Sequence, residues 1–498
     1  MGLAIFSKFF HKKKHNQTHL ETPLVSLIED YAKTKEYFFF KDLTIYHRSN
    51  SIYIPVMLFI PEIGIVLFSI KKWHYQDLLT STLKKSAYLN DDENTLAFDN
   101  IQRFINEKLL DIAQIENINF INFAILPELT SKEYQLLNDS IKNLLPQEKI
   151  LFDKDTIEEI EKKLSALKTH TETYNPYKIL PYLCSEYMII HHQNISFANK
   201  DQRKFIDTSL KQVENISAQR LSGKSHTVLL KALKEKLHNP ELKIAIVVPT
   251  KLHIYLLKQL LLQLIEKSCI MLDMDEFLFF TQIELLKFHA HKINKEIVSY
   301  TKVDPILFKK DIFLADLVLC DDAHTFNDEF IAYLQHIQKK HSLCFINAKE
   351  IPPTYIFNTS YQTNHVEFHP HNTSSHLLRE LYTLLKQKEN PSILIFTEID
   401  EDSSLAEDIT SFTGIQADFI DIEEPQNIIS SQIQIAPLTN TIPLRADYIF
   451  ILTSDNTNLS NLTYLLDASK KTTFILYNED NENIKQFQKD FNGQSDKN

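Results

Sequence analysis

The sequence predicts an α/β protein whose C-terminal part contains parallel sheets. Its 498 residues are enough for roughly two to four domains, each with its own apolar core. From about Phe197 onward, apolar stretches of strand length alternate with stretches of helical periodicity, which is the pattern of a parallel sheet. One apolar stretch leads into the tetrapeptide SGKS at 222–225, and another ends in two aspartates at 321–322. Both features are typical of a phosphate-binding domain.

The composition is that of a soluble globular protein with an acidic balance of charge. Hydrophobic residues make up 43% and charged residues 24% of the chain, and the net charge is −12 at pH 7. This balance argues against a surface that binds nucleic acid by its overall charge. Any such binding would require a local basic groove.

Neither a disulfide framework nor a membrane anchor is expected. The four cysteines lie far apart, without a CxxC pair, and are interpreted as buried thiols in a reducing compartment. The N-terminus places its apolar residues before its basic ones, the reverse of a secretory signal, and predicts a flexible tail at 1–19. The most apolar window, 51–70, is interrupted by Pro55 and Pro61 and predicts two buried strands instead of a transmembrane helix. The protein is therefore expected to be cytoplasmic, with no membrane partner.

A first α/β domain is expected at 20–165, followed by a less regular connector at 166–195. In this domain the pattern predicts helices at 21–35, 97–113, 131–145 and 156–167, and strands at 37–46, 52–60, 63–70 and 118–126.

Two further domains are expected at 196–355 and 356–480, followed by a polar tail at 481–498. The first is predicted to contain helices at 202–210 and 224–236, a strand ending at 217, and strands at 243–248 and 314–320. The second is predicted to contain a helix at 375–386, a helix near 462, and strands at 392–397, 433–436, 448–452 and 472–476.

The segment 218–225, AQRLSGKS, is a candidate phosphate-binding loop. It follows an apolar strand and opens a helix, so Ser222, Gly223, Lys224 and Ser225 can surround a phosphate chain. In such a loop the Lys224 ammonium reaches the terminal phosphates, and the Ser225 hydroxyl holds Mg²⁺. The chain has 5 glycines, where average usage of roughly 7% predicts about 35, so Gly223 marks a position that needs glycine. The alternative is an ordinary helix start at the surface.

The segment 317–324, LVLCDDAH, is the second candidate element. It is an apolar strand that ends in paired carboxylates about 100 residues after the loop. In P-loop NTPases the first acid, here Asp321, holds Mg²⁺ through water, and the second, here Asp322, activates the attacking water as the catalytic residue.

The order of further segments resembles that of the UvrD/Rep-type superfamily 1 DNA helicases. The segment 199–203, NKDQR, stands where that family places an adenine-reading Gln, here Gln202. Later motifs of the family resemble, in order, 244–251 (IAIVVPTK), 281–289, 345–347 (FIN), 360–362 (SYQ) and 464–471 (YLLDASKK). The resemblance covers about 280 residues, without the large inserted subdomains of the longer helicases.

This resemblance implies two RecA-like P-loop NTPase domains, at 196–355 and 356–480, that bind ATP and Mg²⁺. Adenine would lie near Gln202, and Mg²⁺ near Ser225 and Asp321. Single-stranded DNA would cross both domains, and closure of the cleft between them would couple nucleotide state to the grip on DNA.

Departures from the family pattern predict weakened or absent ATP hydrolysis. They lie at Leu221, Asp322, Gln362, Pro443, Arg445 and Ser469. Leu221 replaces a Gly, and Asp322 replaces a Glu, which draws the catalytic carboxylate back by one methylene. Gln362 and Ser469 stand where two phosphate-sensing arginines belong. Arginines at such positions stabilise the charge of the transition state and contribute several orders of magnitude in rate.

Residues 20–165 resemble the nuclease-related domain that is often fused to such helicases, which has a restriction-endonuclease-like fold. The matching segments include 37–44 (YFFFKDLT) and 61–73 (PEIGIVLFSIKKW). Nucleases of that fold bind Mg²⁺ with an Asp and an acid-x-Lys motif. Here Pro55 occupies the Asp position and Ser69 the acid position, and only Lys71 remains. The domain is therefore expected to be structural or to dock DNA, and not to cut it.

The histidine-rich segment 365–371, HVEFHPH, is expected to be a solvated loop. Clustered histidines can bind a metal, but the chain contains 20 histidines, and no acids recur at a fixed spacing from these.

Two functional hypotheses follow. The chain is either a helicase-like ATP-binding protein that acts on single-stranded DNA, or a non-catalytic scaffold with protein partners in a DNA-repair or defence complex. An unrelated P-loop NTPase is a third possibility, which the placement of Gln202 and the motif order disfavour.

Overall fold

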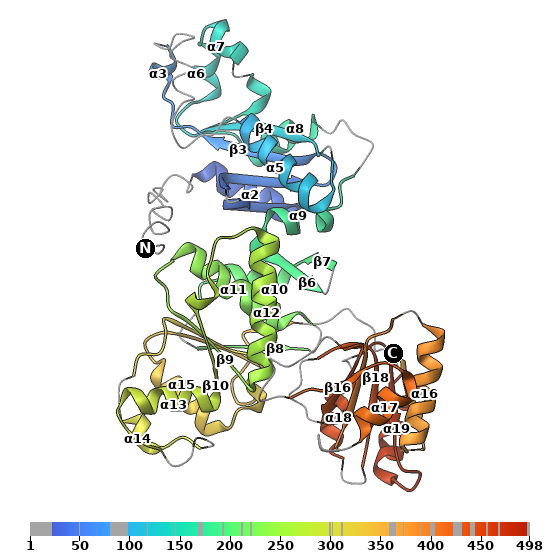
Figure 1. Cartoon of the computed structure of the whole chain (residues 1–498). Coiled ribbons are helices and arrows are strands. Elements are labelled where there is room, and N and C mark those ends of the chain that lie inside the picture. Colours follow the sequence, from blue (N-terminus) through green and yellow to red (C-terminus); the bar gives the residue numbers. More distant parts are fainter. Residues whose placement is uncertain are drawn as a thin grey trace. The chain divides into compact units, whose positions relative to one another are not determined.

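The computed structural model describes residues 22–48, 50–79, 98–116, 118–144, 146–167, 173–191, 194–210, 213–219, 222–297, 300, 302–309, 312–357, 365–371, 373–388, 390–398, 404–421, 431–438, 444–454, 457–466 and 469–495. The chain folds into two compact units (Figure 1). The first comprises Met1–Phe197 and Leu264–Met271, and the second comprises Ala198–Gln263 and Leu272–Asn498.

The first unit contains a mixed five-stranded sheet in the order β1-β2-β3-β4-β5. Its strands are β1 (Phe38–His47), β2 (Asn50–Ile60), β3 (Gly64–Ile70), β4 (Phe120–Leu126) and β5 (Ile150–Phe152). β1, β2 and β3 are antiparallel neighbours, whereas β3, β4 and β5 run parallel. The apolar window 51–70 thus forms the two strands that the sequence predicts, joined by a turn that begins at Pro61.

Two helices cover one face of this sheet. α2 (Pro23–Thr34) begins behind Thr22, whose side chain accepts a hydrogen bond from the backbone N–H of Val25. Ile28 of α2 and Ile160 of α8 (Ile157–Ser165) share a hydrophobic core with Phe68 of β3. The other helices of the unit are α3 (Tyr75–Leu79), α5 (Phe98–Ala113), α6 (Ser131–Gln135), α7 (Asp139–Leu144) and α9 (Pro176–Leu183).

Two segments of the first unit differ from the predicted elements. The single helix predicted at 131–145 is wrong, because α6 ends at Gln135 and the side chain of Asn138 accepts from the N–H of Ile141 at 3.0 Å, which starts a new helix. The segment predicted as an irregular connector contains α9 and an antiparallel pair, β6 (Met188–His191) and β7 (Asn194–Phe197).

The second unit contains two six-stranded sheets in which every described strand pairing is parallel. The first parallel sheet has the order β10-β9-β11-β12-β8-β13. Its strands are β8 (Val213–Ala218), β9 (Ile244–Val248), β10 (Phe277–Thr281), β11 (Leu317–Cys320), β12 (Ser342–Ile346) and β13 (Tyr355–Phe357). β9 and β11 are buried at every position, as expected of central strands that are covered on both faces.

Six helices accompany the first parallel sheet. They are α10 (Lys200–Asp207), α11 (Lys224–His238), α12 (Lys251–Ser268), α13 (Gln282–Lys292), α14 (Pro305–Phe308) and α15 (Asp328–Ile337). Leu285 of α13, Leu307 of α14 and Tyr333 of α15 belong to one hydrophobic core with Val247 and Val318. These three helices therefore lie together against one face of the sheet (Figure 1).

The second parallel sheet has the order β14-β19-β18-β15-β17-β16. Its strands are β14 (His365–His369), β15 (Ile393–Thr397), β16 (Ala417–Phe419), β17 (Ile433–Pro437), β18 (Ala446–Leu452) and β19 (Ser469–Leu476). α16 (Ser374–Gln387) and α17 (Leu405–Thr413) pack on one face through Leu377 and Ile409. α18 (Leu459–Leu466) and α19 (Glu482–Ser495) pack on the other through Leu462 and Ile484.

The C-terminal segment that is expected to be a polar tail forms α19 instead. Ile484 is buried, and Phe487 and Phe491 pack against the same core. These apolar side chains recur at i, i+3 and i+7, so they form one stripe on a helix whose other positions are mostly polar.

The two sheets of the second unit confirm the predicted α/β class with two parallel-sheet domains. The restriction-endonuclease-like identity of the first unit stays a prediction. None of the helices in the described part of the chain has both the length and the apolar character that crossing a bilayer requires.

Candidate functional site

The predicted phosphate loop lies between β8 and α11. β8 ends at Ala218, and α11 begins at Lys224. Gly223 is the N-cap of α11 and has φ 74° and ψ 20°, a left-handed conformation that glycine adopts without steric cost. This conformation explains why one of the five glycines of the chain stands here. Leu221, where the helicase family has a Gly, lies outside the described residues.

The two predicted acids follow β11 at the same edge of the sheet as the loop. β11, β12 and β8 are successive parallel neighbours, so their carboxyl ends lie together. Asp322 has φ 49° and ψ 42°, a left-handed conformation that costs a non-glycine residue about 1–2 kcal/mol. Aspartate tolerates this conformation better than most residues, and here its backbone N–H donates to Asp321 Oδ1.

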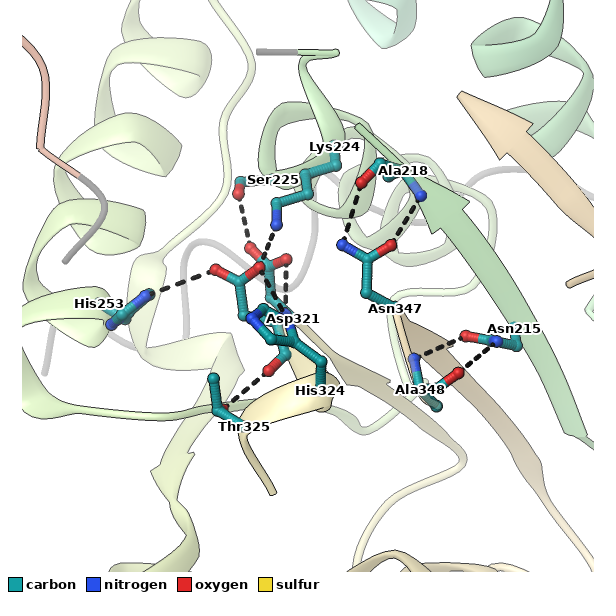
Figure 2. A network of polar contacts seen from close by, with 11 residues as sticks. Asn215, Ala218, Lys224, Ser225, His253, Asp321, His324, Thr325, Asn347 and Ala348 are labelled. Atoms are coloured by element: carbon teal, nitrogen blue, oxygen red, sulfur yellow. Dashed lines mark hydrogen bonds and ion pairs between the residues drawn. The ribbon is translucent and has the colours of Figure 1, made fainter. Parts of the chain in front are cut away.

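The side chains of the loop and the acids contact each other in two pairs (Figure 2). Ser225 Oγ donates a hydrogen bond to Asp321 Oδ2 at 2.6 Å, and Lys224 Nζ forms an ion pair with Asp322 Oδ1. The backbone N–H of Asp322 donates to Asp321 Oδ1 at 3.0 Å, so both carboxylate oxygens of Asp321 are engaged. The structure thus brings together two pairs of adjacent residues that are separated by about 100 positions in the sequence.

Burial and neighbouring charges shift the two carboxyl groups in opposite directions. Burial, followed by the adjacent charge of Asp322, raises the pKa of Asp321. Burial acts in the same direction on Asp322, but Lys224 and His253 outweigh it and hold the pKa of Asp322 below its usual range. Asp322 is therefore the ionised partner of Lys224.

Two histidines next to Asp322 were not predicted. His253 Nε2, from the first turn of α12, lies 3.6 Å from Asp322 Oδ2 (Figure 2). Its Nδ1 lies 2.8 Å from Thr250 Oγ1. His324 Nδ1 lies 3.9 Å from Asp322 Oδ1. Burial lowers the pKa of His324, although Asp322 opposes the shift. The position of His324 directly after the acids is a signal that the sequence offered, whereas the contact of His253 depends on the packing of α12.

Gln202 forms a hydrogen bond to the backbone of the phosphate loop. Its backbone N–H and side chain form a reciprocal capping box with Asn199 at the start of α10. Its side-chain Nε2 also donates to the backbone oxygen of Ser222 at 2.6 Å, and the residue is only 3% exposed. Gln202 therefore fixes one end of the loop; its predicted contact with adenine stays a prediction.

Two asparagines join the ends of β8 and β12 (Figure 2). Asn347 Oδ1 accepts from the backbone N–H of Ala218 at 2.7 Å, and Asn347 Nδ2 donates to the oxygen of Ala218 at 3.0 Å. Asn215 exchanges the corresponding two hydrogen bonds with the backbone of Ala348. Asn347 belongs to the segment that resembles the third helicase motif. In this structure its side chain holds the strand that leads into the phosphate loop.

Other positions of the family pattern have structural partners within the chain. Thr281, from the segment that resembles a short Thr-containing helix of the family, is the N-cap of α13 and forms a capping box with Glu284. Ser469, at one of the two arginine positions, is buried at the start of β19 and accepts a hydrogen bond from Thr473 Oγ1 at 2.9 Å. Two further departures from the pattern lie outside the described residues, Gln362 and Pro443.

The donor set fits a nucleotide phosphate with Mg²⁺. Ser225 and Asp321 offer hydroxyl and carboxylate oxygens, which are the ligands that Mg²⁺ prefers. Ser222 Oγ is buried and has no hydrogen-bond partner within the described part of the chain, so a phosphate oxygen could accept from it. The N-terminus of α11 and Lys224 would supply positive charge for the remaining phosphate oxygens.

In the described part of the N-terminal unit, polar side chains do not gather at one point as they do at the phosphate loop. Val56 of β2 pairs with Phe68 of β3, so Pro55 and Ser69 are the next positions on neighbouring strands. Ser69 Oγ is buried without a hydrogen-bond partner in the described structure. Among the described residues of this unit, no three His, Cys, Asp or Glu side chains come close enough together to share a metal ion.

No protein-family model and no curated protein matches the sequence. Among solved structures, the chain is similar to Mss116p bound to single-stranded RNA and AMP-PNP, with 9% identity over 57% of this chain and 70% of that chain and a TM-score of 0.40. It is similar to the DUF1998 helicase MrfA bound to DNA, with 9% identity over 58% of this chain and 49% of that chain and a TM-score of 0.42. It is also similar to S. cerevisiae Dbp5 bound to RNA and ADP BeF3, with 10% identity over 57% of this chain and 85% of that chain and a TM-score of 0.41. At TM-scores below 0.5 these similarities add nothing to the fold class that the two parallel sheets establish.

Proposed function

We propose that the chain is a helicase-like ATP-binding protein with two RecA-like domains, in which ATP hydrolysis is weak or absent. The observation that carries this proposal is the pairing of Ser225 with Asp321 and of Lys224 with Asp322 at the carboxyl edge of one parallel sheet. In P-loop proteins a lysine neutralises the terminal phosphates, while a hydroxyl and an acid hold Mg²⁺. An ordinary helix start at the surface would not need two buried acids opposite it.

Nucleotide binding would change the partner of Lys224. In the structure Lys224 is paired with Asp322, so the phosphates of ATP have to replace this carboxylate or share the lysine with it. Mg²⁺ supplies charge that the phosphates and Asp321 can share when ATP is bound. The contact between Lys224 and Asp322 therefore lowers nucleotide affinity relative to a loop whose lysine has no competing partner.

The surroundings of Asp322 favour slow turnover. A general base must reach the attacking water, but the Asp322 carboxylate is almost fully buried and lies between Lys224 and His253. Ser469, where the family has a transition-state arginine, is buried and bonded to Thr473. Both features reduce hydrolysis more than they reduce binding.

Single-stranded DNA is the proposed nucleic-acid partner, on the resemblance of 244–251 to a DNA-contacting motif, which the helicase-like segment 281–289 follows in the same order. The first segment contains β9, and the second begins α13 directly after β10. β9 is the parallel neighbour of both β10 and β11. The N-termini of α12 and α13 therefore lie at the same sheet edge as the phosphate loop. Backbone donors at helix N-termini can hold nucleic-acid phosphates without an overall basic surface.

The direct test is a titration of the protein with ATP by calorimetry, with Mg²⁺ and then with EDTA. Lys224→Ala is expected to weaken binding by about a hundredfold, close to 2.7 kcal/mol. Lys234→Ala is the matched control, because Lys234 lies on the same helix and pairs with Asp207 at 2.6 Å, away from the loop. Equal affinity for the wild type and Lys224→Ala would rule out the proposed site.

A second measurement distinguishes an active ATPase from a non-catalytic scaffold protein. ATP hydrolysis is measured with single-stranded DNA, with single-stranded RNA and without nucleic acid. DNA-stimulated turnover that disappears in Lys224→Ala would establish a working ATPase and contradict the weak hydrolysis proposed here. Binding without turnover above that variant would favour the alternative, a non-catalytic partner in a repair or defence complex.

A further inference from the structure

A cluster of histidine and glutamate side chains lies in the second parallel-sheet domain, where β14 leads into α16. His369 is the last residue of β14, and His376 and Glu380 are on the first turns of α16. One nitrogen from each histidine and one carboxylate oxygen lie within 4.8 Å of one another. No other such group of three was found among the described residues. This cluster is separate from the phosphate loop, which belongs to the first parallel sheet.

The distances within the cluster match those of ligands around one metal ion. His369 Nδ1 lies 3.4 Å from His376 Nε2, and His376 Nε2 lies 3.8 Å from Glu380 Oε1. Two nitrogen ligands of a tetrahedral zinc ion, each at ~2.0–2.1 Å, are separated by roughly 3.3–3.4 Å. The two imidazoles are therefore already at the spacing that a shared ion requires.

A second carboxylate orients the His369 ring. Glu367 Oε2 lies 3.4 Å from His369 Nε2, on the side of the ring away from His376. If Nε2 carries the proton and donates it to Glu367, Nδ1 keeps its lone pair for a metal. A carboxylate behind a ligating histidine is a recurrent feature of metal sites, since it fixes the tautomer and makes the ligand more basic.

Regular secondary structure holds the three ligands in place. His376 and Glu380 are four residues apart on α16, so both side chains lie on one face of the helix. Thr373 caps this helix and accepts from the backbone N–H of His376 at 3.2 Å. β14 pairs with β19 along its length, including His369 with Leu476. Ligands on a paired strand and a capped helix need little rearrangement on binding a metal.

We propose that His369, His376 and Glu380 bind a divalent transition-metal ion, zinc foremost, with His371 available as a fourth ligand. The His371 ring centroid lies 5.5 Å from that of His376, and a side-chain rotation would bring it to the ion. Side-chain exposures of 22% for His369, 18% for His376 and 28% for Glu380 show a half-buried site instead of a solvated loop. Two imidazoles and one carboxylate select zinc-like ions over Mg²⁺, which prefers oxygen ligands.

The competing explanation is a hydrogen-bonded chain of His369, His376 and Glu380 without a metal. In that arrangement His376 would donate to one neighbour only, because its Nε2 faces both. Arg379 lies on the same helix and adds a positive charge near His376, which opposes a cation. Binding has therefore to be demonstrated with the metal itself.

The experiment is a zinc titration of chelator-treated full-length protein by calorimetry, in the presence of millimolar Mg²⁺. One equivalent of Zn²⁺ is expected to bind the wild type, and a Co²⁺ titration is expected to give the visible absorption of tetrahedral cobalt. His376→Ala and Glu380→Gln should each weaken Zn²⁺ binding by about a hundredfold or more, and His371→Ala by less. His238→Ala, an exposed histidine at the end of α11, is the control and should bind as the wild type does.

A thermal melt with and without Zn²⁺ keeps the test independent of folding defects. Zn²⁺ should raise the melting temperature of the wild type and of His238→Ala, but not that of the two ligand variants, whose melts without metal should match the wild type. Absence of saturable Zn²⁺ binding by the wild type would overturn the proposal. So would unchanged stoichiometry and affinity in both ligand variants.

Discussion

The N-terminal sheet and the first parallel sheet are built on equally apolar strands, but polar side chains converge in only one of them. Met57 and Leu58 of β2 and Ile65 of β3 are as buried as the whole of β9. At the positions that the resemblance to the nuclease-related domain predicts for the acids, the N-terminal sheet has Pro55 and Ser69. At the carboxyl edge of the first parallel sheet, by contrast, two acids face the lysine and the serine of the loop.

This difference shows that a sheet and the site built on it are maintained by separate groups of residues. Burial of apolar strands stabilises both sheets and requires no particular polar residue at a strand end. The charges at the phosphate loop are buried, which is unfavourable unless each one is paired. The pairs that Asp321 and Asp322 form are therefore a stronger indication of function than the fold that carries them.

The largest effect is expected from removing the charge of Asp321, the acid that we propose holds Mg²⁺. Asp321→Asn keeps the size of the side chain but removes the charge that would face Mg²⁺. We expect the affinity for Mg-ATP to fall about a thousandfold, close to 4 kcal/mol, while the affinity for ATP in EDTA changes little. Calorimetric titrations under both conditions measure this difference. An equal loss in EDTA would mean that Asp321 holds the loop together and does not hold the metal.

The next test concerns a buried polar group of the same domain that is remote from the loop. His289 of α13 is buried, its Nδ1 lies 2.8 Å from Tyr333 Oη, and burial, followed by Lys292, lowers its pKa from 6.5 to about 4. The unfolded chain therefore binds the proton between about pH 6.5 and pH 4, where the folded chain does not. Stability is fully present above pH 6.5 and decreases as the pH falls towards 4, by up to ~3 kcal/mol.

Thermal melts between pH 7 and pH 4 measure this effect as a difference between the wild type and His289→Asn. Asparagine can keep a hydrogen bond to Tyr333 but does not titrate in this range. We expect the wild type to lose more stability on acidification than the variant. Parallel pH profiles would show that His289 is not the group responsible.

A smaller effect tests whether every buried acid of the first parallel sheet belongs to the site. Glu214 of β8 is 1% exposed, and neither of its carboxylate oxygens has a hydrogen-bond partner in the described structure. Glu214→Met replaces this carboxylate with an apolar side chain of similar size, so we expect a gain of about 1–2 kcal/mol in stability. The melting temperature should rise by several degrees, and ATP affinity should stay unchanged. A loss of ATP affinity would place Glu214 within the functional site.

Strands such as β1 to β4, β9 and β15 could be predicted because their apolar runs are long and bounded by polar segments. The strands that were not predicted include β5, β10, β12, β13, β14 and β16, and the expectation of a solvated loop at 365–371 was wrong for β14. The break at Asn138 could not, because the apolar spacing of 131–145 continues through it and only a side-chain hydrogen bond ends the helix. α19 was hidden by its polar composition, although Ile484, Phe487 and Phe491 have helical spacing. The local spacing of apolar residues therefore located the elements with long apolar runs. It failed where a few side-chain contacts decide where a helix begins or ends.

The candidate site, like the fold, could be predicted from the sequence only in part. The two motifs and their order along the chain predicted that Ser225 and Asp321 would lie together around Mg²⁺, and the structure places these two side chains in contact. The choice of Asp322 as the partner of Lys224, and the approach of His253, depend on the left-handed turn at Asp322 and on the packing of α12. The cluster at His376 joins a strand end to a helix face, and neither element reveals it alone.

The smallest expected effect concerns the N-terminal sheet, where we predict no change at all in DNA cleavage. Because Pro55 and Ser69 stand at the positions where the nuclease-related family is expected to have its acids, these two positions cannot hold Mg²⁺ beside Lys71. The wild type and Lys71→Ala should therefore both leave plasmid DNA intact in Mg²⁺ and in Mn²⁺, as read on agarose gels. The backbone N–H of Lys71 donates to Ile125 at 2.9 Å, so the substitution keeps the strand pairing. Cleavage by the wild type that disappears in Lys71→Ala would mean that other acids complete a nuclease site, and the contrast between the two sheets would no longer hold.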